Sequence, residues 1–94
     1  MEIESTLDNV VVFDIPAPYE TECLCELLQA GRLAWRYERR RVPLVATALR
    51  ADPYDLADLH RTVEGWAGER GLGALRFELD GRSYVLYTKR VPAL

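Results

Sequence analysis

The chain has few of the residues that carry out covalent or metal chemistry. Its 94 residues include two cysteines and one histidine. Cys23 and Cys25 fall inside a predicted helix, where residues two apart point to different sides. In that geometry they cannot form a disulfide with each other, and two such ligands do not hold a zinc ion. The sequence therefore predicts no disulfide framework, no metal centre and no cofactor. Of the two thiols, we expect Cys23 to be the more buried.

Nucleophiles with a neighbouring base are also scarce. Ser5 precedes every predicted element, and Ser83 lies beside a predicted turn without the context of a nucleophile elbow. His60 lies at the border of the apolar stripe of a predicted helix, and we expect it to be a partly buried structural residue. The alternative is a ligand-binding or enzymatic pocket between helices and sheet, with His60 and Tyr54 as polar groups. We expect a protein that is not an enzyme.

The chain also lacks a long hydrophobic run, so no membrane span is expected. The first four residues, Met1 to Glu4, do not have the basic and then apolar pattern of a secretory leader. A cytoplasmic location is therefore the expectation. Residues 1–9 are compatible either with a free acidic arm or with an added strand, because Ile3, Leu7 and Val10 allow both.

Hydrophobic periodicity divides the rest of the chain into seven segments. The apolar runs and alternating patterns predict strands over residues 10–15, 33–38, 42–50, 75–79 and 84–88, and helices over 19–30 and 53–70. A continuous helix over residues 19–41 is the competing interpretation, which Gly31 and the aromatic alternation disfavour. The order β-α-β-β-α-β-β predicts a single α+β domain. We expect one mostly antiparallel sheet with two helices packed on one face, a ferredoxin-like sandwich with an extra strand.

The second helix and the last hairpin carry the clearest local signals. Asp52-Pro53 supplies an N-cap acceptor followed by proline at the first helical position. Asp55 then falls at the third helical position, where a carboxylate is favourable without any chemical role. Gly71 is the expected stop of this helix, and Asp80-Gly81 predicts a tight hairpin turn.

The parity of the last hairpin indicates which side chains face outward. Leu75, Phe77, Leu79, Tyr84 and Leu86 share one face, and Arg76, Glu78, Val85 and Tyr87 share the other. If both helices cover the first face, the second is left open, together with one side of the strand that carries Trp35. An apolar patch of that kind on a small sheet usually means association. The sequence therefore predicts an interface with Trp35, Tyr37, Val85 and Tyr87 as apolar anchors.

Charge is unevenly distributed, although the net charge is only −3. Residues 1–31 hold seven acidic residues and no basic one, whereas residues 32–50 hold six arginines and one glutamate. Such separation predicts two surfaces of opposite sign, which face each other within the fold or are offered to partners. Lys89 is the only lysine, a bias typical of GC-rich bacterial genes.

An arginine cluster at the turn of the first predicted hairpin adds to this interface. Its members are Arg36, Arg39, Arg40 and Arg41. They would orient a protein partner, or bind nucleic acid or another polyanion, or form a solvated hairpin tip. The pI of 5.1 disfavours nucleic acid. We therefore expect a homodimer, or a small subunit, adaptor or regulator of a larger assembly.

Overall fold

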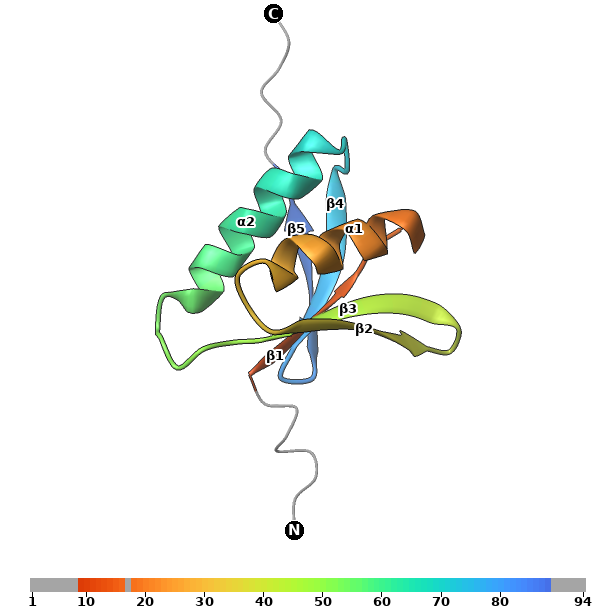
Figure 1. The fold of residues 1–94 in the computed structure, drawn as a ribbon. Helices are drawn as coiled ribbons and strands as arrows, with labels where there is room; N and C mark the ends of the chain where they lie inside the picture. The colour runs from red at the N-terminus through yellow and green to blue at the C-terminus, as the bar shows by residue number, and fades with distance from the viewer. Residues whose placement is uncertain (1–8, 17, 89–94) are drawn as a thin grey trace, which may run out of the picture.

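The computed structural model of the chain describes residues 9–16 and 18–88 (Figure 1). The elements of this part are β1 (Val10–Asp14), α1 (Pro18–Gln29), β2 (Ala34–Arg39), β3 (Val42–Ala48), α2 (Asp55–Glu69), β4 (Ala74–Leu79) and β5 (Arg82–Tyr87). Their order is the predicted one, and the competing interpretation of one helix over residues 19–41 is wrong. Residues 1–9 were expected to form either a free arm or a strand. All of them except Asn9 lie outside the described residues, and this includes Ser5.

The strands form one antiparallel sheet in the order β2-β3-β1-β4-β5. Helix α1 connects β1 to β2 with β3 between them, and α2 connects β3 to β4 with β1 between them. This pattern is that of a ferredoxin-like sandwich, to which β5 adds a fifth strand beside β4. The predicted fold class is confirmed.

Both helices pack against the same face of the sheet, which we call the inner face (Figure 1). Helix α1 lies over β2 and β3, and the ring of His60 on α2 contacts the ring of Phe77 on β4. The core between the two layers is a single cluster of buried side chains, which includes Val11, Phe13, Val45, Leu75 and Leu86 from the sheet and Leu24, Leu28, Leu59, Val63 and Trp66 from the helices. Burial of this cluster is the main force that holds the helical layer on the sheet.

The spacing of Cys23, Leu24, Leu27 and Leu28 in the sequence predicts that these four form the buried stripe of α1, but the helix is rotated away from that phase. The buried residues are Thr21, Leu24, Cys25 and Leu28, and Leu27 is exposed. Cys25 is therefore the more buried thiol, and the expectation for Cys23 is wrong. Burial raises the pKa of the Cys25 thiol, which keeps it protonated and unreactive. The phase was hidden from the sequence because a polar residue, Thr21, occupies one of the core positions.

Helix α2 begins at Asp55, later than predicted. Asp52 instead closes a turn before the helix: its side-chain Oδ1 accepts a hydrogen bond from the Tyr54 N–H at 2.9 Å, and its carbonyl accepts one from Asp55 N–H at 3.0 Å. The other end agrees with the prediction. Gly71 adopts a left-handed φ of 75°, and Leu72 N–H bonds back to the Ala67 carbonyl at 2.9 Å.

The two hairpins use turns of the same geometry with very different residues. Asp80 and Gly81 have φ values of 55° and 78°, and Arg40 and Arg41 have φ values of 55° and 68°. Positive φ at both central positions defines a type I′ turn, which favours Asn-Gly or Asp-Gly. Asp80-Gly81 meets that preference. Arg40-Arg41 does not, so this turn holds two arginines in a backbone conformation that costs about 1 kcal/mol or more for each.

The second position of each turn holds arginine in one hairpin and glycine in the other. Exchanging these residue types should change the free energy of unfolding of the protein in opposite directions. We expect Arg41→Gly to raise the free energy of unfolding by about 1 kcal/mol, because glycine adopts positive φ without strain. We expect Gly81→Arg to lower it by a similar amount. Urea denaturation of the two variants measures both effects, and equal signs would contradict the assignment of strain to Arg41.

Candidate functional site

The face of the sheet away from the helices is the candidate site, and we call it the outer face. Register partners place its side chains in rows that cross the sheet. One row is Trp35, Ala46, Val12, Glu78 and Ser83, and the next is Tyr37, Leu44, Asp14, Arg76 and Val85. Each row combines apolar residues at and near β3 with charged residues on β1 or β4. The outer face is therefore amphipathic across its width.

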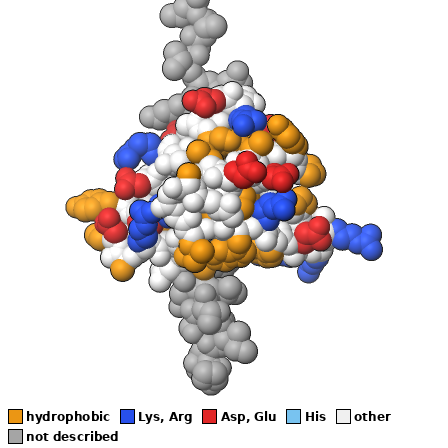
Figure 2. Space-filling view, in the orientation of Figure 1, with side chains coloured by type: hydrophobic (Ala, Val, Ile, Leu, Met, Phe, Trp, Pro, Cys, Tyr) orange, Lys and Arg blue, Asp and Glu red, His pale blue; other side chains and the backbone are white. Residues whose placement is uncertain are grey.

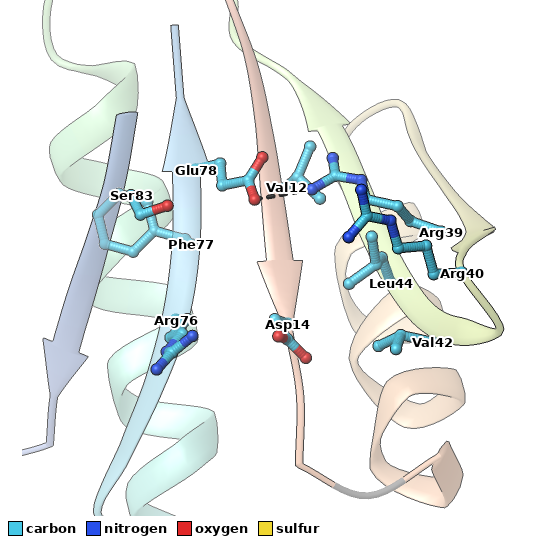
Figure 3. Close-up of a pocket in the computed structure, with 10 residues that line it drawn as sticks. All are labelled: Val12, Asp14, Arg39, Arg40, Val42, Leu44, Arg76, Phe77, Glu78 and Ser83. Atoms are coloured by element: carbon cyan, nitrogen blue, oxygen red, sulfur yellow. Dashed lines mark hydrogen bonds and ion pairs between the residues drawn. The ribbon is translucent and has the colours of Figure 1, made fainter. Parts of the chain in front are cut away.

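The sheet curves strongly, so the outer face is hollow rather than flat. In Figure 1 the β2–β3 hairpin crosses steeply over the direction of β4 and β5. As a result Arg39, on β2, reaches Glu78, on β4, and the guanidinium Nη1 lies 2.8 Å from the carboxylate Oε2 (Figure 3). This bond spans two intervening strands. The same curvature buries Leu44 and Ala46, although neither helix covers them.

A groove follows β1 along the outer face. It consists of three hollows, of about 130, 180 and 310 Å³. The outward residues of β1 line them in order: Val10 and Val12 the first, and Val12 and Asp14 the second. Asp14 also lines the third, together with Pro16, which follows the strand. The Arg39–Glu78 pair lines both the first and the second hollow. Neighbouring hollows share lining residues of β1, so the three form a row along this strand, which we call the outer groove.

Charged side chains from both walls project into the second hollow (Figure 3). Arg39 and Arg40 enter from the β2–β3 hairpin, and Arg76 lies across from them beside Asp14. Hydrogen bonds to Glu78 and to Tyr37 raise the pKa of Arg39, so its charge is fixed. No ion pair of Arg40 or Arg76 is found among residues 9–16 and 18–88. These two guanidinium groups are the ones that a ligand could engage without displacing a partner.

The structure divides the predicted arginine cluster. Arg36 lies on the inner face, where its guanidinium is 3.9 Å from Glu22 on α1. Arg39 lies on the outer face and is paired with Glu78. Arg40 and Arg41 form the turn, and neither has an ion pair in the described part of the chain. Figure 2 likewise shows acidic and basic side chains intermingled over the face in view. Among the described residues, only the Arg36–Glu22 pair joins the basic block of residues 32–50 to the acidic block, so the two blocks do not face each other as a whole.

The predicted apolar anchors all belong to the outer face, but they lie at its two edges. Trp35 and Tyr37 are on β2, and Val85 and Tyr87 are on β5. Four strand spacings separate the pairs, which is about 19 Å in a flat sheet. They do not form one patch, because Asp14, Arg76 and Glu78 lie between them. The face on which each side chain lies was predictable from the parity of its strand, whereas the order of the strands was not.

The alternative site at His60 is small and open. His60 is exposed rather than partly buried, and its ring lies against Phe77 with centroids 5.9 Å apart. The hollow beside it has a volume of about 10 Å³, and Tyr54 does not line it. Tyr54 is exposed at the start of α2. The two polar groups of this alternative are therefore not brought together around a cavity.

A buried ion pair was missed by the sequence interpretation. Asp55 is 2% exposed, and Arg32 donates to both of its oxygens at 2.6 and 2.9 Å. Arg50 adds its backbone N–H at 2.8 Å. Arg32 also donates to the Ala48 carbonyl, and the Arg50 guanidinium to the Gly31 carbonyl. These contacts tie both loops at this end of the sheet to the first turn of α2, which gives Asp55 a structural role.

The hydrogen bonds from Arg32 lower the pKa of Asp55 to about 2, and those from Arg50 act in the same direction against the effect of burial. The signal available in the sequence was a loop arginine, Arg32, and an acid at a helix start. Nothing local connects them, because they are 23 positions apart.

Other kinds of site find no support in the described residues. No cluster of three histidine, cysteine or carboxylate side chains that could hold a metal ion occurs among them. None of the helices there is long and apolar enough to cross a membrane. Comparison with known protein families, with curated proteins and with solved structures returns no match for this chain. The candidate site therefore depends on the geometry of the outer face.

Proposed function

We propose that this chain is a non-enzymatic protein that acts by binding other protein chains through the outer face. It would do so as a homodimer, or as a small subunit, adaptor or regulator of a larger assembly. One observation carries the proposal: within residues 9–16 and 18–88, no helix or strand lies over the outer face, although Trp35, Val85 and Tyr87 on it are 37%, 47% and 73% exposed. Uncovered apolar surface of this kind is stabilised when a partner removes it from water.

The chemistry of the face suits a protein partner. Trp35, Val42, Val85 and Tyr87 are exposed apolar residues of this face, and tryptophan is the residue type most often dominant in interface energetics. Arg40 and Arg76 add charges that steer and orient an approaching chain. Protein interfaces combine apolar and aromatic contacts with polar and charged ones, and the outer face offers both kinds.

Light scattering across a wide dilution series, together with affinity capture, tests the proposal. We expect self-association or a captured protein, weakened by about tenfold or more in Trp35→Thr or in Tyr87→Thr, according to which edge of the outer face makes the contact. Threonine keeps the strand preference of the site while it removes the aromatic ring. Tyr54→Thr is the control, because Tyr54 is an exposed aromatic residue outside the sheet. A strict monomer that captures no protein would refute the proposal.

Polyanion binding is the second candidate, and one observation favours it. Arg40 and Arg41 project from the hairpin turn without ion pairs in the described chain, despite the backbone strain that this turn carries. Retention on heparin at low salt, lost as salt is added, would support it. If the protein passes through the column at low salt and still associates with protein, the polyanion proposal is wrong and the first proposal stands.

A further inference from the structure

The two edges of the sheet are protected to different degrees. A free strand edge presents unpaired N–H and C=O groups, and proteins commonly block such edges with charged residues or proline. Strand β2, at one edge, carries Arg36, Glu38 and Arg39. Strand β5, at the other, has the sequence Arg-Ser-Tyr-Val-Leu-Tyr, with Arg82 as its one charged residue. The β5 edge therefore has fewer of the residues that block pairing with another strand than the β2 edge has.

Strand β5 also concentrates exposed apolar surface. Tyr84, Val85 and Tyr87 are 42%, 47% and 73% exposed, and all three belong to this strand of six residues. Tyr84 faces the helix side and stacks on Phe77, with ring centroids 5.2 Å apart. Val85 and Tyr87 face the outer side. Both faces of the edge strand therefore offer apolar contacts to a neighbour.

The direction of the free backbone groups follows from the pairing with β4. In an antiparallel strand, alternate residues direct their N–H and C=O groups to the same side. Thr88 N–H donates to the Gly73 carbonyl at 3.1 Å, on the β4 side. Residues of even number, such as Tyr84 and Leu86, therefore bond toward β4. Ser83, Val85 and Tyr87 direct their groups away from β4, to the edge that no other strand of the described residues covers, which we call the open edge.

From these features we infer that β5 pairs with the β5 of a second copy of this chain, in antiparallel register about a two-fold axis at Val85. This inference rests on the proposed function, for which it names the partner and the edge. The axis at Val85 makes Ser83 and Tyr87 reciprocal partners, so all three open-edge residues form hydrogen-bonded pairs. It also sets Tyr84 opposite Leu86 on the helix side, an aromatic and aliphatic cross-strand pair.

Charge and symmetry favour a second copy over an unrelated strand. An antiparallel strand that meets itself repeats every contact, which is the property of an isologous interface. The two Arg82 residues lie at opposite ends of the pair, about 20 Å apart, beyond the range of strong repulsion at physiological salt. The two outer faces then join into one continuous surface with the Val85 pair at its centre.

Amide hydrogen exchange by NMR is the direct test. As the concentration is raised, the N–H groups of Ser83, Val85 and Tyr87 should become protected, while those of Tyr84 and Leu86 are protected throughout. A chain that remains monomeric at the highest concentration would overturn the inference. So would a dimer in which the three open-edge amides still exchange rapidly.

Val85→Pro is the matching variant, since it removes an N–H that points to the open edge and breaks no bond to β4. We expect the dimer dissociation constant to rise by about tenfold or more, with the circular dichroism spectrum unchanged. If the proline variant does not fold, Val85→Lys blocks the edge by charge. Its control is Val42→Lys, because Val42 is another half-exposed valine of the outer face but lies on β3.

The variants separate the two ideas. Loss of association in Trp35→Thr with none in Val85→Pro would overturn the β5 pairing and leave the proposed function standing. If Val42→Lys weakens self-association as much as Val85→Lys does, the contact lies at the outer groove, and the β5 pairing is wrong. Self-association lost in Val85→Pro and retained in Val42→Lys supports the pairing through β5.

Discussion

Replacement of Asp55 by asparagine is expected to lower the free energy of unfolding by about 3–5 kcal/mol. The Arg32 side chain is 9% exposed, and its two hydrogen bonds to the Asp55 carboxylate offset the free energy that removing its charge from water costs. Asparagine has nearly the same shape but no charge, and its amide group cannot accept the second bond. The guanidinium would then be left buried without a counter-charge, which costs more than the ion pair itself contributes.

Urea denaturation at neutral pH, followed by tryptophan fluorescence, measures this effect. The midpoint should fall while the slope stays constant, because the folded core is unchanged. Asp52→Asn is the matched control. Asp52 is exposed and accepts a single backbone hydrogen bond through its side chain, so we expect a loss of about 1 kcal/mol or less. Equal losses in the two variants would show that the buried pair is not the main contact at this end of α2.

The same carboxylate should make the protein sensitive to acid. Its pKa is lowered from 3.8 to about 2 in the folded protein, chiefly by the hydrogen bonds from Arg32. A lowered pKa means that the folded state binds the proton less readily than the unfolded state does. The stabilisation is therefore fully present above about pH 4, and it is lost as the pH falls from about 4 to about 2. The loss amounts to about 2 kcal/mol.

Comparison of the wild type with Asp55→Asn isolates this contribution. We expect the difference between their free energies of unfolding to be constant from about pH 7 to pH 5 and then to shrink by about 2 kcal/mol toward pH 2. The comparison is needed because other carboxylates also titrate in this range. A difference that stays constant down to pH 2 would mean that the pKa of Asp55 is not lowered in the folded protein.

The Asp55 cluster also matters for the candidate site, although it lies outside it. It ties the loop after α1 and the loop after β3 to the start of α2. At the other end of α2, the Arg70 guanidinium lies 3.3 Å from Glu20 at the start of α1. These contacts join the helices to each other and to the loops at the sheet's end. The helical layer is thereby held to one face, and the outer face is left uncovered by the helices and strands that the structure describes.

Element order was predictable because each element is specified by its own residues. Alternation of apolar and polar side chains identified β4 and β5, and Asp80-Gly81 identified their turn. The parity of a strand also shows which side chains share a face. Val85 and Tyr87 could therefore be placed together on the face away from Tyr84 before any strand order was known.

Residues that act through distant partners could not be predicted in this way. Asp55 was expected to need no partner, and Arg39 was grouped with its neighbours Arg36 and Arg40. In the structure Arg39 is bonded to Glu78, which is 39 positions away, and Arg36 lies on the other face of the sheet. The same holds for Cys23 and Cys25, whose relative burial depends on how α1 is rotated against β2 and β3.

By itself, the sequence determined the seven elements, the hairpin turns and the one-sided pattern of apolar residues, because propensity and periodicity act between residues that are near in the chain. Only the tertiary structure decided the strand order, the curvature that creates the outer groove, the pairing of Arg32 with Asp55 and the exposure of β5 as an edge. Those features depend on contacts between distant segments. Local patterns do not encode them, since many packings of the same elements would bury the same stripes.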